Sequence, residues 1–235
     1  GGGHVIRDNT IEGAFEDGVG GSPNHSGLNG GPYHDTDIYN NRMTNCRDDG
    51  IEAEGSSVNV RIWGNFVKGC YVGIGLAPQY IGPSYVFGNV LLESRSNGFK
   101  LGEVSRGRTY IYHNTVYSRA GPDAQGIANS GGDSSANFYI NAVFLNNIVD
   151  VERRPISRGF AANVHDWDNL FSRDTALAAI CAVSNAPCNA DDAKYFTLSE
   201  LRAATGLELN GMSVDTTSEY VNLAGGDVHL RSGSP

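Results

Sequence analysis

An acidic cluster is the first group of residues with types and spacing that could do chemistry. Asp48, Asp49 and Glu52 lie within a run of five positions, and the repeat described below places Asp17 one coil away. Grouped carboxylate oxygens suit Ca²⁺ better than a transition metal. These four residues are therefore a candidate calcium site. The alternative is that Asp48-Asp49-Gly50 is only a turn, for which Asp and Gly are common residues.

Lys100 is the basic group that the repeat brings to the same face. Alignment of the repeating units predicts two columns of stacked residues: Asp17, Asp49, Val72 and Asn97 in one, and Gly20, Glu52, Gly75 and Lys100 in the other. Because side chains alternate along a strand and Phe99 points inward, Lys100 points outward, as does Glu52. Two coils separate this acid from this amine, about 10 Å at the usual strand spacing. Gly75 between them would leave a shallow trough in which a sugar ring could lie.

Two arginines follow the strand that carries Lys100. Arg106 and Arg108 belong to an Arg-Gly-Arg turn, and guanidinium groups pair well with carboxylates. They are candidates for contacts with an anionic substrate. The alternative is that they are solubilising residues of a loop.

A strip of aromatic residues forms a second candidate surface. Trp63, Tyr85, Tyr110 and Tyr112 alternate with apolar residues, so their rings should lie on the outer face of the predicted strands. Such a strip could stack on sugar rings. It could equally be covered by the long loops.

A repeat built on asparagine must position all of these residues. An Asn followed two places later by an apolar residue recurs at Asn9, Asn41, Asn65, Asn89, Asn114 and Asn147. The spacing indicates a unit of about 24 residues with longer insertions at two places, which is typical of a solenoid. Each unit contains three short apolar runs, and we interpret these as three strands. A stacked Asn ladder would satisfy backbone groups where the chain turns inward.

The predicted fold is all-β: a right-handed parallel β-helix with a short C-terminal helix and cap. We expect coils over residues 1–160, and a terminal coil and capping region of the same domain over 161–235. Thr197-Leu198-Ser199-Glu200 followed by Gly206 indicates a capped helix, which would close the open end of the solenoid. An ordinary β-sandwich is the alternative.

Composition limits the partners. The chain has 235 residues and a net charge of −9, and we identify no basic cluster, which disfavours nucleic acid. No apolar run reaches about 18 residues, so we predict no membrane span. The opening Gly1-Gly2-Gly3-His4 shows no signal peptide, and we expect that the chain belongs to a longer protein. The oligomeric state stays open.

The cysteines bear on the cellular location. Cys46 and Cys70 fall at the same place in adjacent repeats and should stack, either as a disulfide or as two buried thiols. Cys181 and Cys188 bracket a short loop-like segment in which a small disulfide is expected, and their spacing does not favour zinc. Two bridges would imply export. We therefore predict a secreted or cell-surface protein.

Two short segments carry a family resemblance. Asp48-Asp49-Gly50-Ile51-Glu52 and Asn97-Gly98-Phe99-Lys100-Leu101-Gly102 resemble motifs of the family-nine pectate lyases, which are parallel β-helices. The resemblance implies that Asp48, Asp49 and Glu52 hold Ca²⁺ and that Lys100 abstracts a proton. Glu52 stands where the family has Asp, and the upstream ligand is either Asp17 or a residue in the loop from Gly20 to Asp37.

The function expected from these features is cleavage of an acidic polysaccharide by β-elimination. Ca²⁺ on a uronate carboxylate would stabilise the enolate, and a neutral lysine would serve as the base. A glycoside hydrolase that uses Asp49 with Glu52 or Asp17 is one alternative. A glycan-binding or structural β-helix without catalysis is the other.

Overall fold

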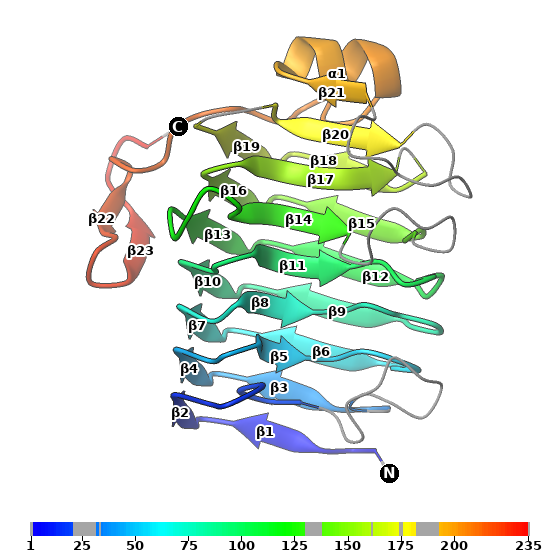
Figure 1. Ribbon diagram of the computed structural model, residues 1–235, viewed down its shortest axis with the longest axis vertical. Helices are drawn as coiled ribbons and strands as arrows, with labels where there is room; N and C mark the ends of the chain where they lie inside the picture. Colours follow the sequence, from blue (N-terminus) through cyan, green and yellow to red (C-terminus); the bar gives the residue numbers. More distant parts are fainter. Residues whose placement is uncertain are drawn as a thin grey trace.

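The computed structural model describes residues 2–20, 32, 34–129, 138–160, 162–173, 176–181 and 193–234. Its body is a stack of coils in which three sheets of seven strands each run along one axis (Figure 1). Every strand pair within these sheets is parallel except β20 with β21. The predicted parallel β-helix is confirmed.

Each coil contributes one strand to each sheet. The first sheet consists of β1 (Val5–Arg7), β3 (Asp37–Tyr39), β6 (Val60–Trp63), β9 (Ser84–Phe87), β12 (Thr109–Tyr112), β15 (Ala142–Leu145) and β18 (Val164–Asp166). The second consists of β2 (Thr10–Glu12), β4 (Arg42–Thr44), β7 (Phe66–Lys68), β10 (Val90–Leu92), β13 (Thr115–Ser118), β16 (Ile148–Val151) and β19 (Asn169–Ser172). The third consists of β5 (Asp49–Glu52), β8 (Val72–Gly75), β11 (Asn97–Leu101), β14 (Gln125–Asn129), β17 (Arg154–Phe160), β20 (Ala178–Cys181) and β21 (Ala193–Tyr195).

The core is a set of apolar columns along the solenoid axis. In the first sheet, Ile38, Ile62, Val86, Ile111 and Phe144 pair in register and are fully buried. Because the pleat alternates, their neighbours in sequence point away from the core. The outer faces of the sheets are thus free to carry polar and aromatic residues.

The asparagine ladder forms as the repeat predicts. Each side-chain amide donates to the next asparagine: Asn41 to Asn65 and Asn65 to Asn89 at 3.0 and 2.9 Å, and Asn89 to Asn114 and Asn114 to Asn147 both at 3.0 Å. The ladder then reaches Asp168, whose Oδ1 accepts from the Asn147 amide at 2.9 Å. A carboxylate therefore takes the last position of a run of amides.

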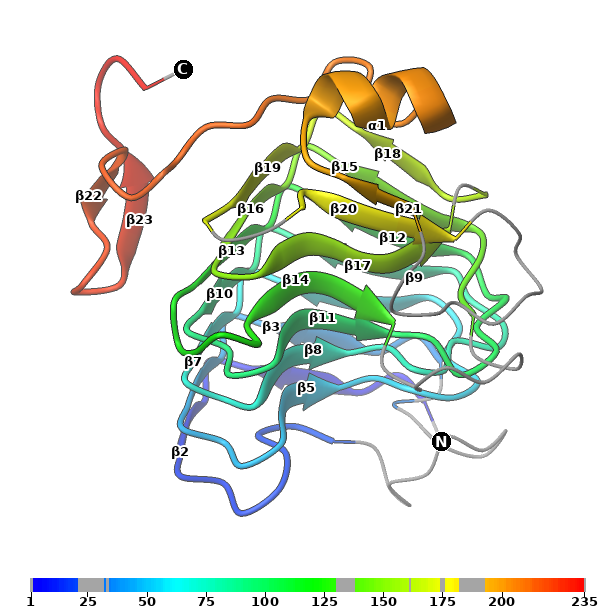
Figure 2. The same ribbon diagram turned by 45° about the horizontal axis from the view of Figure 1, so that its top comes forward.

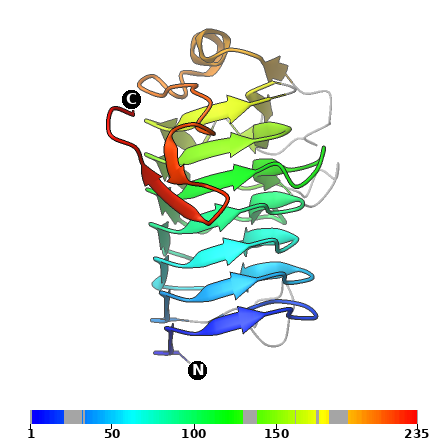
Figure 3. The same ribbon diagram turned by 90° about the vertical axis from the view of Figure 1, so that its left-hand side faces the viewer.

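The C-terminal segment closes one end and covers one side. Helix α1 (Leu198–Thr205) begins at the capping box of Thr197 and Glu200 and ends at Gly206, which has a φ of 72°. Figure 2 shows this helix over the end of the coils. The hairpin of β22 (Tyr220–Asn222) and β23 (Asp227–Leu230) lies beside the stack of coils (Figure 3). Its Tyr220 packs with Leu92 and Tyr117 of the second sheet. Strands β18, β19 and β20 continue the coils past residue 160, and the division there stays a prediction.

The cysteines fall into two groups. Cys46 and Cys70 stack as buried free thiols, and the Cys46 amide donates to the Cys70 sulfur at 3.2 Å. Cys181 takes part in a disulfide, while its predicted partner Cys188 lies outside the described residues. In the described part of the chain, no helix combines the length and apolarity that a membrane crossing requires.

Candidate ligand-binding site

An open cleft lies on the outer face of the third sheet. Its volume is about 570 Å³. Five basic side chains line it, against two acidic ones: Lys100, Arg153, Arg154, Arg158 and Lys194 against Asp48 and Glu103. Lys100 already pairs with Asp49 and Glu54, and Arg153 pairs with Asp123. In a chain with a net charge of −9, the basic lining that remains favours anions near Arg154.

The register of three adjacent strands builds the floor of the cleft. Asn97 of β11 pairs with Gln125 of β14, which pairs with Arg154 of β17. Toward β8 and β5, Asn97 aligns with Val72 and Asp49. The alignment predicts the part of this column from Asp49 to Asn97, and the structure extends it to Gln125 and Arg154, which project an amide and a guanidinium group toward the cleft.

The second predicted column is also present, but its trough is filled. Glu52, Gly75 and Lys100 pair across β5, β8 and β11. The Lys100 Nζ lies 2.7 Å from Asp49 Oδ2 and 2.8 Å from Glu54 Oε1. A Cβ at Gly75 would collide with the Asp49 carboxylate. Gly75 therefore gives Lys100 the space to reach Asp49, and the predicted trough for a sugar ring does not stay open.

These ion pairs decide the charge of Lys100. Burial disfavours the ammonium, but the carboxylates of Asp49 and Glu54 outweigh burial and raise the pKa of Lys100 above its ordinary value. Burial in turn raises the pKa of Asp49 to about 7, although the ammonium opposes this. A base must be neutral to accept a proton. In this arrangement Lys100 is a fixed cation, and its role as a base stays a prediction.

The four predicted metal ligands do come together. Asp17 Oδ1 accepts from the Asp49 amide at 3.0 Å, and carboxylate oxygens of Asp17, Asp48 and Asp49 all lie within 4.8 Å of one another. Glu52 is buried beside them, and burial together with its bonds to Asp17 and Glu54 raises its pKa to about 10. Asp49 also pairs with the Lys100 ammonium, which already offsets part of the negative charge of the cluster. Calcium binding here stays a prediction.

The two candidate arginines after the Lys100 strand lie outside the cleft. The Arg106 guanidinium lies 4.8 Å from the centre of the Phe138 ring, and that of Arg108 lies 5.2 Å from the Tyr110 ring. Neither lines the cavity. They belong to the segment that joins β11 to β12, and their contacts with substrate stay a prediction.

The aromatic strip is on a different sheet from the cleft. Trp63 stacks on Phe87 with ring centres 6.1 Å apart, Tyr112 stacks on Phe87 at 5.1 Å, and Tyr85 stacks on Tyr110 at 5.4 Å. These half-buried rings on the first sheet are nearly parallel and cover one another's faces, which are the surfaces that a sugar would use. Sugar binding by this strip stays a prediction.

Sequence reasoning missed the residue that best marks the cleft. Arg154 is 7% exposed, and its Nε has no hydrogen-bond partner among the described residues. Burial, then the charges of Arg153 and Arg158, lower its pKa. The expectation of no basic cluster is wrong here, because Arg153-Arg154 and Arg158 stand within six positions. That run was the available signal, and only the fold shows that it faces a cavity.

Comparison with known proteins gives a family. Residues 3–166, more than half of the 235-residue chain, match the family described as periplasmic copper-binding protein (NosD). The chain belongs to the NosD family. No curated protein and no solved structure matched it. A periplasmic family agrees with the predicted export, whereas membership of the family-nine pectate lyases is not confirmed.

The matched region of this NosD-family chain contains the whole Lys100 cluster and Arg154. The family description names copper, and copper favours nitrogen or sulfur donors over carboxylates alone. The Asp17, Asp48 and Asp49 cluster offers oxygen only. That donor set is a poor fit for copper.

Proposed function

We propose that this protein is an exported NosD-family β-helix that binds an acidic oligosaccharide, a chain of uronate units, in the cleft of the third sheet. Arg154 carries the proposal. A buried guanidinium without an anionic partner among the described residues is costly. A ligand carboxylate would offset that cost and accept two parallel hydrogen bonds.

The remaining lining suits a sugar. Asn97, Gln125 and Ser157 provide groups that hydrogen-bond to hydroxyls, and Tyr71 at the edge is 48% exposed. The Arg95 guanidinium lies over this ring, 5.9 Å from its centre, and a sugar would stack on the part of the ring that Arg95 leaves exposed. A positively charged cleft would also overcome the repulsion between an acidic protein and an acidic polymer.

Binding is favoured over the two catalytic alternatives. Lys100 is held as an ammonium, so β-elimination lacks its base. Asp49 and Glu52 are 1% and 6% exposed and neither lines the cleft, which disfavours a hydrolase built on them. The calcium-dependent lyase stays a testable alternative.

Calorimetric titration with oligogalacturonate tests the proposal. We expect Arg154→Gln to weaken binding about 30-fold or more, because loss of one partner of a buried charge pair costs about 2 kcal/mol or more. Arg42→Gln is the matched control: it removes the same charge from an exposed arginine over Phe66 on the second sheet. Equal loss in both variants, or equal affinity for a neutral oligosaccharide, would refute a specific site.

The same samples test the lyase. Ultraviolet absorbance of unsaturated uronates is followed with calcium and with a chelator. A calcium-dependent rise that Lys100→Met abolishes would overturn the binding-only function. No rise, together with the loss of affinity in Arg154→Gln, supports it.

A further inference from the structure

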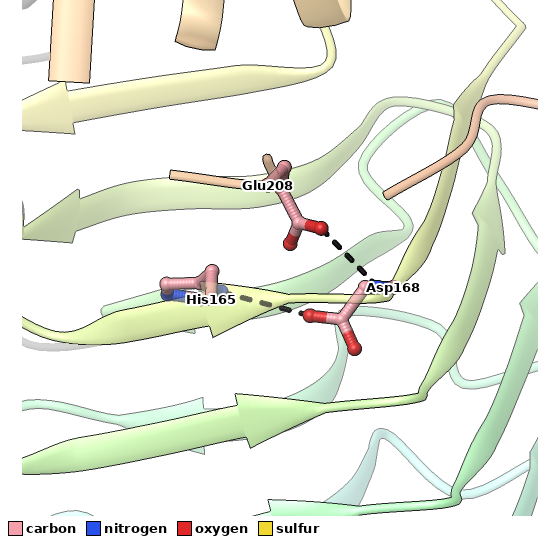
Figure 4. A group of neighbouring side chains, drawn as sticks. All are labelled: His165, Asp168 and Glu208. Atoms are coloured by element: carbon pink, nitrogen blue, oxygen red, sulfur yellow. Dashed lines mark hydrogen bonds and ion pairs between the residues drawn. The ribbon is translucent and has the colours of Figure 1, made fainter. Parts of the chain in front are cut away.

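A second charged cluster lies at the end of the solenoid, away from the cleft. It consists of His165 on β18, Asp168 just before β19, and Glu208 in the segment that follows α1 (Figure 4). The Glu208 amide donates to the His165 carbonyl at 2.8 Å, and the Met212 amide donates to the Asp168 carbonyl at 2.8 Å. The cap segment is thus joined to the last coil at this point.

The three side chains converge in a closed space. His165 Nδ1 lies 4.0 Å from Asp168 Oδ2, and one donor atom from each residue lies within 4.8 Å of the others. Glu208 Oε2 accepts from the Asp168 amide at 3.2 Å. Their exposure is 2% for His165 and 0% for Asp168 and Glu208.

Four polar atoms of the cluster lack hydrogen-bond partners among the described residues. They are both ring nitrogens of His165, Asp168 Oδ2 and Glu208 Oε1. Buried polar atoms are normally paired, and leaving one unpaired costs about 1–3 kcal/mol. Such a concentration of unpaired atoms is expected where an ion binds, or where the Asp168 and Glu208 carboxyls, which lie within hydrogen-bonding reach of each other, share a proton.

Asp168 stands at a position of the ladder where an asparagine would be expected. Asp168 Oδ1 accepts from Asn147, as an asparagine oxygen would in the ladder. An asparagine here would complete the ladder without a charge. The carboxylate instead leaves Oδ2 facing His165. Arg202, the basic residue of the cap, donates to the backbone carbonyls of Glu208 and Gly211 rather than to a carboxylate.

We propose that His165, Asp168 and Glu208 bind one divalent transition-metal ion, Cu²⁺ in preference to Zn²⁺. One imidazole nitrogen with two carboxylate oxygens suits these ions, and Cu²⁺ binds such a set most tightly. The absence of a sulfur donor in the set disfavours Cu⁺.

The distance between His165 and Asp168 fits such an ion, and the donor atom of Glu208 lies within 4.8 Å of both, so a small inward shift of its carboxylate would complete the site. Two donors about 2.1 Å from one ion can be at most about 4.2 Å apart, and the 4.0 Å between His165 and Asp168 is within this limit. The bound metal would connect the cap segment to the last coil.

The competing occupant is a proton shared by the two carboxyl groups. Burial and the neighbouring Asp168 raise the pKa of Glu208 to about 10, so a neutral acid could occupy the same place. Glu208→Gln separates the two, because glutamine reproduces the neutral acid but is a poor metal ligand.

The test measures copper content, electron paramagnetic resonance and thermal unfolding of the full chain after growth with added copper. The parent should hold one Cu²⁺ per chain, with splitting from one nitrogen. Glu208→Gln should bind Cu²⁺ at least about 100-fold more weakly and lose the thermal shift that copper gives the parent. His165→Phe, which keeps the stacking on Phe144, should lose the nitrogen splitting.

Asp48→Asn is the control, because it alters the oxygen cluster at the cleft and should leave copper content unchanged. Copper retained in Glu208→Gln, or lost in Asp48→Asn, would overturn the assignment. A parent that binds no copper or zinc and is no more stable than Glu208→Gln would assign the cluster to a shared proton.

Discussion

Lys100 and Arg154 are two cations on the same face of the same sheet, but only Lys100 has carboxylate partners. Lys100 on β11 has two carboxylates within 2.8 Å of its ammonium. Arg154 on β17 lies two strands further along, more deeply buried, and no described residue pairs with its Nε. The charge of Lys100 is therefore balanced within the fold, whereas the proposed ligand would supply the anion that Arg154 lacks.

The difference shows that a charged residue in a cleft is not in itself a ligand site. Lys100 has the more conspicuous sequence motif, yet the carboxylates of Asp49 and Glu54 neutralise its charge. Arg154 has no motif, yet it is the group that an acidic ligand would satisfy. The predictions below alter one side of this comparison at a time.

The largest effect is expected from Lys100→Met. Removal of the ammonium leaves Asp49 and Glu54 buried without their cation, which should lower the free energy of unfolding by about 3 kcal/mol at pH 7.5. Both carboxyls already have raised pKa values through burial, and they bind protons more readily when folded. The loss should therefore shrink as the pH falls to 5.5. Urea unfolding at the two pH values measures this, and a loss independent of pH would contradict it.

A smaller effect is expected from Glu52→Gln in the same cluster. The pKa of Glu52 is raised to about 10, so the folded protein keeps a proton that the unfolded chain loses above its ordinary pKa of about 4.3. This proton stabilises the parent at low pH, and the stabilisation is lost as the pH rises toward 10. The glutamine side chain is neutral without binding a proton, so the stability of the variant lacks this dependence on pH. The variant should equal the parent near pH 4 and exceed it by about 2 kcal/mol at pH 6, because each pH unit above the unfolded pKa adds about 1.4 kcal/mol.

Equal unfolding curves at both pH values would show that Glu52 is ionised in the folded protein. Asp48→Asn is the matched control, because Asp48 is exposed in the same segment. It should show no such growth of the difference with pH.

The smallest effect on stability is expected from Arg154→Met. Methionine keeps the packing of the stem and removes an unpaired charge, so the free energy of unfolding should rise by about 1 kcal/mol in the absence of ligand. Thermal or urea unfolding measures this. A loss of stability would mean that Arg154 already has an anionic partner, and the comparison with Lys100 would fail.

The repeat shows how much the sequence alone can predict. Because every coil has the same three strands, aligning the asparagines and the glycines of the third strand was sufficient to pair Asp49 with Val72 and Asn97, and Gly75 with Lys100. Neighbours in a solenoid lie at a nearly constant separation in sequence, so the register follows from the period. The ladder, the stacked thiols and the helix cap follow from the same local rules.

The tertiary structure alone decided which groups satisfy one another. Glu54, outside the recognised motif, became a partner of Lys100, and Arg154 came to face a cavity rather than solvent. Glu208, which follows α1 in the chain, accepts a hydrogen bond from the Asp168 amide, and this contact has no periodic signal in the sequence. The period of the repeat determines where the strands lie, but each side-chain charge is balanced by the particular side chains that contact it. That balance depends on burial and on irregular segments, which a repeat does not encode.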